Sequence, residues 1–238
     1  MPLSLNSRFC GNVYIIQCRG RLVAGDEVKS LEGALEVGVR EFSRLVLHVG
    51  EVDRLDSTGM GLLVRYAANT RKRGGDIRLA APPPFVVTLL DVTKLSRVLQ
   101  IHPTEEDAIL SFLRERSAQM TQEQLGPRVL VLDQSADLCA FVRTVLMQHG
   151  FDAKSTNRLS DAKILLQVDK MDYILLGPDA SHFSSETVLR SLKALAPGAS
   201  ALHLGENFKS RDAHEASEVL LQMLGANTNS VNSKSPAS

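Results

Sequence analysis

The chain has 238 residues, enough for two domains of ordinary size, and 44% of them are hydrophobic, which gives each domain material for a core. Lysine plus arginine and aspartate plus glutamate each number 27, so the charge balance indicates neither nucleic acid nor an anionic membrane as partner. The apolar runs are too short to span a bilayer. The three cysteines lack metal-ligand spacing and no secretory segment is recognisable, which predicts reduced thiols in a cytoplasmic protein.

The first half of the chain alternates strand-like and helical patterns. Gly11-Asn12 separates two strand-like runs and is a strong hairpin signal. The expected elements are strands over 3–9 and 13–22, a helix over 24–42, a strand over 45–49, a helix from about 57, a strand over 77–81, a helix over 85–95, a short strand over 98–101 and a helix over 105–116.

The stretch 52–66 is the most informative, because a strand passes into Asp56-Ser57-Thr58-Gly59 and leaves directly as a helix. Asp56 or Ser57 suits the N-cap of that helix, and backbone N–H groups exposed at a helix start can receive a phosphate. By pattern alone, the simpler interpretation is a capping cluster without further function. The core-facing stripe of the helix is expected to contain Met60, Leu63, Val64 and Ala67.

This order of elements, with Gly20-Arg21-Leu22 closing the second strand and 56–61 opening a helix, resembles the STAS domain of bacterial anti-sigma factor antagonists. The resemblance covers roughly residues 1–116. It implies an α/β fold in which helices pack on a mixed sheet.

The resemblance also implies a function. In STAS antagonists, the residue after the aspartate is the serine that is phosphorylated by the anti-sigma factor, itself an ATP-dependent serine kinase, and here that residue is Ser57. Asp56 is then the acidic neighbour, Thr58 a second hydroxyl, and Gly59 the residue that lets the partner approach, with Met60 completing the expected partner-binding surface. The chain would sequester the kinase and so regulate sigma-dependent transcription. A separate serine phosphatase would reverse the modification, and the chain itself would need no catalytic residue and no cofactor.

The physics of such a switch follows from charge. Phosphorylation of Ser57 adds roughly −1.5 to −2 charge beside Asp53 and Asp56. The helix dipole and free N–H groups would tolerate this charge, whereas a partner surface matched to a neutral serine would meet like-charge repulsion of several kcal/mol. Two alternatives stay open: an unphosphorylated STAS scaffold, such as an accessory subunit of a lipid transporter or signalling assembly, and a response regulator with an active receiver.

The second half follows a polar link over 117–127 and alternates regularly between strands and helices. This alternation predicts a flavodoxin-like, doubly wound parallel sheet over 128–226. The segment 227–238 is polar and is expected to be a disordered tail. The expected strands lie over 129–132, 151–155, 173–176 and 201–204. One expected helix ends near 150, two others span 160–168 and 185–195, and a fourth follows the last strand.

This half resembles the receiver domain of response regulators in its pattern but lacks the receiver's chemistry. The acidic pair that would hold magnesium is reduced to Asp133 and Gln134, and Gly177 stands where the resemblance places the phosphate-accepting aspartate. Asp179, two residues after Gly177, is an alternative acceptor, but a side chain two positions beyond the strand end is expected to point in a different direction. We expect no metal site and a pseudo-receiver, with its final strand and helix eroded or missing, that serves protein binding or self-association. Receivers also carry a hydroxyl residue at the end of the fourth strand, and Leu204-Gly205 stands there in this chain. They carry a lysine before a proline after the fifth strand, and the only similar sequence here is Lys234-Ser235-Pro236 in the polar tail.

Overall fold

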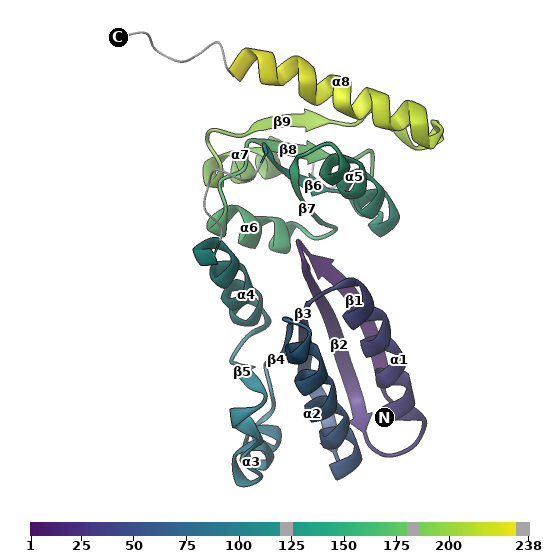
Figure 1. Cartoon of the computed structure of the whole chain (residues 1–238), viewed down its shortest axis with the longest axis vertical. Coiled ribbons are helices and arrows are strands. Elements are labelled where there is room, and N and C mark those ends of the chain that lie inside the picture. The colour runs from purple at the N-terminus through teal and green to yellow at the C-terminus, as the bar shows by residue number, and fades with distance from the viewer. Residues whose placement is uncertain (120–125, 180–185, 232–238) are drawn as a thin grey trace. The chain divides into compact units, whose positions relative to one another are not determined.

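The computed structural model describes residues 1–119, 126–179 and 186–231. The chain divides into two compact units, Met1–Met120 and Thr121–Ser238, and each is described here by itself (Figure 1).

The first unit is built on a mixed sheet with the strand order β5-β4-β3-β2-β1. Strands β1 and β2 form an antiparallel hairpin in which Cys10 faces Val13 across the predicted Gly11-Asn12 turn. The other neighbouring strands are parallel. The strands are β1 (Ser4–Cys10), β2 (Val13–Leu22), β3 (Arg44–Leu55), β4 (Asp76–Ala80) and β5 (Gln100–His102).

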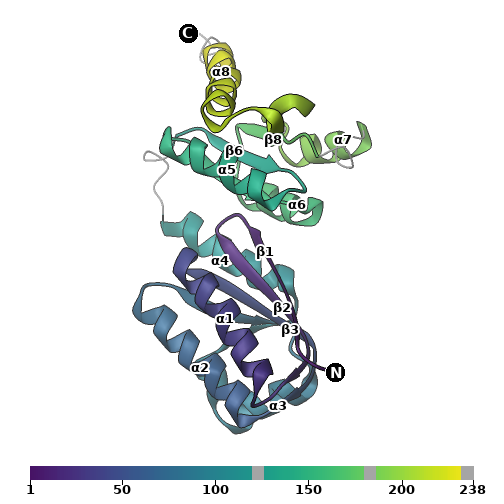
Figure 2. The ribbon, with the colours of Figure 1, turned by 90° about the vertical axis from the view of Figure 1, so that its right-hand side faces the viewer.

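Helices α1 (Asp26–Glu41) and α2 (Ser57–Lys72) cover one face of this sheet (Figure 2). The crossovers β2-α1-β3 and β3-α2-β4 step in the same direction, so right-handed connections place both helices on the same side. Helix α3 (Pro84–Val92) contributes Val86 and Leu90 to the same core, and the turn Leu95–Arg97 leads to β5. The buried residues of α2 include the expected Met60, Leu63 and Ala67 together with Leu62, whereas Val64 is half-buried.

Helix α4 (Glu105–Gln119) lies on the opposite face and is held there by a buried arginine. Ile77 and Leu79 of β4 point into the core beneath α2, so Arg78 between them points to the other side. Its side chain is 2% exposed, contacts the Ser111 hydroxyl and Glu115 of α4, and lies 3.7 Å over the Phe112 ring. This cluster fixes α4, which continues to Gln119 and so occupies the first three residues of the expected 117–127 link.

The second unit is an all-parallel sheet with the strand order β7-β6-β8-β9. Every residue of Val129–Leu132 is buried, as expected for a strand covered on both faces. The strands are β6 (Arg128–Leu132), β7 (Asp152–Thr156), β8 (Tyr173–Leu176) and β9 (Ser200–His203).

Its helices form two layers. The crossovers on either side of β6 step in opposite directions, which places α5 (Ala136–Gln148) on one face and α6 (Leu159–Val168) on the other. Helix α7 (Glu186–Leu195) contacts α6, and α8 (Ala213–Val231) contacts α5. A short 3-10 helix, Glu206–Ser210, precedes α8.

The end of this unit corrects one expectation. Helix α8 is the helix expected after the last strand, with Ala216, Leu220 and Leu224 buried, and no further strand or helix follows it within the described residues. Helix α8 also extends through 231, into the segment expected to be a disordered tail, because lengthening an existing helix avoids the cost of nucleation. The rest of that segment, 232–238, lies outside the described residues.

Candidate functional site

Ser57 lies at the edge of the first sheet where the parallel strands β2, β3 and β4 end and α1, α2 and α3 begin. It is the first residue of α2, and both Ser57 and Thr58 are exposed. The Ser57 side chain is therefore accessible to solvent and is not covered by any described part of the first unit.

Asp56 is the N-cap of α2 and fixes the loop around Ser57. Its Oδ1 accepts the backbone N–H groups of Thr58 and Gly59, both at 2.9 Å. Its Oδ2 accepts the N–H of Ala24 at 2.8 Å, which ties the loop after β2 to the start of α2. These backbone hydrogen bonds, that of Gly59 first, hold the pKa of Asp56 below its usual range, and the positive charge of Arg54 acts in the same direction.

The same hydrogen bonds correct the expectation that the helix start offers free N–H groups. Thr58 and Gly59 donate to the Asp56 carboxylate, and the N–H of Met60 donates to the Asp56 carbonyl at 2.9 Å. Three N–H groups of the first turn are therefore already satisfied within the chain. A phosphate on Ser57 would be balanced mainly by the helix dipole rather than by this row of donors.

Two residues of the expected partner surface face inward. A Cβ on Gly59 would lie 2.6 Å from the Leu22 carbonyl oxygen, so the close approach that needs this glycine is made by the chain's own β2 rather than by a partner. Met60 is 5% exposed and belongs to the core. Gly61 has open space around its Cα. The accessible part of the motif therefore consists of Ser57, Thr58 and the exposed surface of α2 around Gly61.

The corresponding edge of the second unit holds a buried carboxylate. Asp133 follows β6 and is fully buried. Its Oδ1 accepts the N–H of Ser135 at 2.7 Å, and its Oδ2 accepts the N–H of Asp179 at 2.9 Å. Burial, the largest influence, raises the pKa of Asp133 above its usual range. A Cβ at Gly177 would lie 2.1 Å from Asp133 Oδ2, so this position has no room for a side chain.

The residues at this edge do not fit a magnesium ion. Both oxygens of Asp133 are used by backbone N–H groups, and the adjacent Gln134 is exposed and supplies no carboxylate. Within the described ranges, no group of three or more His, Cys, Asp or Glu side chains gathers as a metal site would require.

The structure adds one residue that sequence reasoning missed. Lys209, in the short helix after β9, forms an ion pair with Asp179, and the hydrogen bond to Asp179, together with its negative charge, raises the pKa of the lysine. No spacing signal marks Lys209, because the expected lysine was sought after a fifth strand at Lys234, which lies outside the described residues. Asp179 thus points toward a lysine and donates its N–H to Asp133.

Comparison with known proteins identifies the first unit. Residues 5–108 match the family model of the STAS domain, so this part of the chain is a STAS domain. The match covers less than half of the chain, and the second unit lies outside it.

A proposed anti-sigma factor antagonist from Thermotoga neapolitana is 26% identical over 68 residues, which are 29% of this chain and 60% of that protein. The chain thus spans 60% of the length of this relative. Among solved structures, a proposed antagonist from Thermotoga maritima is 19% identical, with 45% of this chain and 92% of that one covered at a TM-score of 0.43. The Bacillus cell-fate determinant SpoIIAA in its phosphorylated form is 18% identical, with 46% and 98% covered at a TM-score of 0.38.

None of the helices in the described ranges combines the length and the apolar character needed to cross a membrane. The cysteines Cys10, Cys18 and Cys139 are buried, and burial raises the pKa of the Cys18 and Cys139 thiols to about 12.

Proposed function

We propose that the chain is an anti-sigma factor antagonist that is switched by phosphorylation of Ser57. The observation that carries this proposal is the exposed Ser57 hydroxyl at the first position of α2, in a loop that Asp56 holds in place through three backbone hydrogen bonds. The STAS domain and the relative named as an anti-sigma factor antagonist support the same function.

In the unmodified state, the Ser57 edge would dock an anti-sigma factor that has serine kinase activity, and so release the sigma factor. Phosphorylation would place a dianion beside the carboxylate of Asp56, whose pKa is lowered by its backbone hydrogen bonds. Two like charges at an interface cost several kcal/mol, and each 1.4 kcal/mol is a factor of ten in affinity. The phosphoryl transfer belongs to the kinase and its reversal to a separate serine phosphatase, so this chain acts as a binding protein rather than an enzyme.

The second unit is proposed to be a receiver-like module without phosphoryl chemistry. Its strand order corresponds to the first four positions of the 2-1-3-4-5 order of flavodoxin-like sheets. Gly177 supplies no nucleophile, and Asp133 is committed to backbone N–H groups. Such a unit would serve binding of another protein or self-association.

The test is intact-mass analysis after incubation of the full chain with candidate anti-sigma kinases and ATP. We expect one phosphate on the parent protein and on Thr58→Ala, and none on Ser57→Ala. Thr58→Ala is the matched control, because it removes the neighbouring exposed hydroxyl and leaves the Thr58 N–H bond to Asp56 intact. A phosphate that persists on Ser57→Ala would contradict the proposal.

The same preparations separate the switch from a constitutive scaffold. We expect the phosphorylated parent to lose its affinity for the kinase by at least tenfold. Equal affinity in both states would support an unphosphorylated STAS scaffold instead. Labelling by acetyl phosphate that disappears in Asp179→Ala would support an active receiver.

A further inference from the structure

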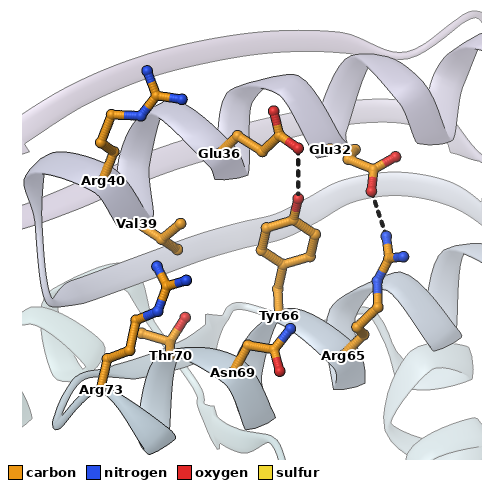
Figure 3. Close-up of a pocket in the computed structure, with 9 residues that line it drawn as sticks. All are labelled: Glu32, Glu36, Val39, Arg40, Arg65, Tyr66, Asn69, Thr70 and Arg73. Atoms are coloured by element: carbon orange, nitrogen blue, oxygen red, sulfur yellow. Dashed lines mark hydrogen bonds and ion pairs between the residues drawn. The ribbon is translucent and has the colours of Figure 1, made fainter.

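A groove between α1 and α2 of the STAS domain has the features of a ligand site, and it is separate from the Ser57 edge. Its volume is about 510 Å³, within the range of small-molecule sites. Glu32, Glu36 and Arg40 follow one another at four-residue intervals along α1, while Tyr66, Asn69 and Arg73 lie on the facing side of α2 (Figure 3).

One end of this groove is closed by contacts between the two helices. Arg65 forms an ion pair with Glu32, and the Tyr66 hydroxyl donates to Glu36 across 3.4 Å (Figure 3). The Glu32 carboxylate is neutralised by its partner, whereas the long contact to Tyr66 leaves Glu36 able to accept further hydrogen bonds. This end of the groove therefore suits the donor groups of a ligand.

The other end of the groove is lined by two arginines. Arg40 and Arg73 have no ion-pair partner among the described residues, and both line the large groove and an adjoining hollow of about 180 Å³. In Figure 3, the Arg73 side chain extends from α2 toward α1 beside Val39. Glu41 also lines the smaller hollow, and in Figure 3 the Arg40 guanidinium is turned away from α2. Arg40 is exposed, so its long side chain is free to turn toward Arg73, and two guanidinium groups brought together in this way favour a compact dianion, since each offers several donors in a planar array.

A buried hydroxyl points to the same place. Thr70 is 5% exposed, lines both hollows, and its Oγ1 has no hydrogen-bond partner within the described part of the chain. A buried polar atom of this kind costs free energy until a partner reaches it.

The cap at the C-terminal end of α2 does not use the side chains of Arg40, Thr70 or Arg73. The Thr70 carbonyl oxygen already accepts the N–H groups of Arg73 and Gly75, each at 3.0 Å, so the arginine side chains are not needed to satisfy the end of α2. Positive charge near this helix end also interacts with the dipole, but that function requires no facing arginine on α1.

We propose that the α1/α2 groove binds a small phosphate monoester, with its phosphate at Arg40, Thr70 and Arg73 and the hydroxyl or ammonium groups of its organic part at Glu36. The site lies outside the proposed Ser57 switch and does not depend on it. It would give the STAS domain a second input, a metabolite, on a face formed by the same helix that begins at Ser57.

The test is titration of the isotopically labelled full chain with phosphoethanolamine, glycerol 3-phosphate and glucose 6-phosphate, followed by amide NMR. We expect at least one of them to saturate with a dissociation constant below about 1 mM, with the largest shifts at Val39, Arg40, Asn69, Thr70 and Arg73. Inorganic phosphate alone and glucose alone should bind at least tenfold more weakly, because each reaches only one end of the groove.

Matched variants decide whether the binding is specific. Arg40→Gln and Arg73→Gln should each weaken it at least tenfold, whereas Lys72→Gln, which removes the same charge from the same helix end outside the groove, should stay within twofold. An unchanged thermal transition shows that each variant is folded. Lack of saturation by 10 mM for all three esters, or equal weakening in Lys72→Gln, would overturn the proposal; these outcomes leave the Ser57 proposal untouched.

Discussion

The edges of the two sheets where strands end and helices begin use the same local device with opposite results. In each unit, an aspartate directly after a strand accepts the N–H of the residue two positions later, Thr58 for Asp56 and Ser135 for Asp133. Asp56 is half-buried and its pKa is lowered, because backbone hydrogen bonds outweigh desolvation. Asp133 is fully buried and its pKa is raised, because desolvation outweighs its hydrogen bonds.

This difference shows how one motif yields two kinds of site. Around Asp56, the chain leaves a hydroxyl exposed beside a fixed carboxylate, which is an arrangement open to modification. Around Asp133, the carboxylate itself occupies the space into which a side chain at position 177 would extend, so that position holds only glycine. Backbone hydrogen bonds to the carboxylate are present in both places, so the degree of burial decides whether the pKa of the aspartate is lowered or raised.

The largest effect is expected from restoring an acceptor with Gly177→Asp. Its Cβ would overlap Asp133 Oδ2 and add a second buried carboxylate, which should lower the free energy of unfolding of the second unit by roughly 3–5 kcal/mol. Amide hydrogen exchange read separately in each unit measures this loss. Gly198→Asp is the control, because Gly198 is exposed with open space around it. A stable Gly177→Asp protein labelled by acetyl phosphate would contradict the packing described here.

The next effect compares two glycines in the first turn and a half of α2. Gly59→Ala should destabilise the STAS domain by roughly 1–3 kcal/mol, since its Cβ would lie 2.6 Å from the Leu22 carbonyl oxygen. Gly61→Ala has open space and should stabilise it by about 0.5–1 kcal/mol through helix propensity. Chemical denaturation of the two variants measures the contrast, and equal effects would show that Gly59 does not contact β2 as closely as described.

The opposite pKa shifts predict opposite dependences on pH. Because the folded pKa of Asp56 is lowered, its contribution to stability is present above the unfolded pKa of about 3.9 and is lost as pH falls through the folded value. Because the folded pKa of Asp133 is raised, its contribution is present below about pH 3.9 and is lost as pH rises through the folded value.

Differences between the parent and Asp56→Asn or Asp133→Asn isolate these contributions between pH 3 and 7. Subtracting the free energy of unfolding of each variant from that of the parent at the same pH cancels the contributions of the other carboxylates. Slopes of the same sign in both units would refute the distinction between a hydrogen-bonded and a desolvated aspartate.

The smallest effect on stability is expected at Ser57 itself. Ser57→Asp places a negative charge at an exposed helix start and should change the free energy of unfolding by no more than about 0.5 kcal/mol, while weakening kinase binding at least tenfold. Thermal unfolding and a binding titration measure the two effects on the same sample. A large loss of stability would mean that position 57 is coupled to the core.

Periodicity was sufficient to predict most of the elements. The hairpin at Gly11-Asn12, the helix that starts at the Asp56 motif and the parallel alternation after Arg128 were all expected, because turn chemistry, capping and hydrophobic period are local properties. The ends of elements were less predictable. β3 runs six residues beyond the expected Val49, since pairing with β2 continues through Leu55.

The resemblances to known families, aligned on recognisable strands, selected Ser57, Asp133 and Gly177 as the informative positions. Only tertiary structure decided what their neighbours do. Gly59 and Met60 face inward because β2 and the core lie beneath α2, and Arg40, Thr70 and Arg73 come together because two helices distant in sequence pack side by side. Burial and pairing across the fold depend on contacts between segments far apart in the chain, and these contacts leave no periodic trace in the sequence.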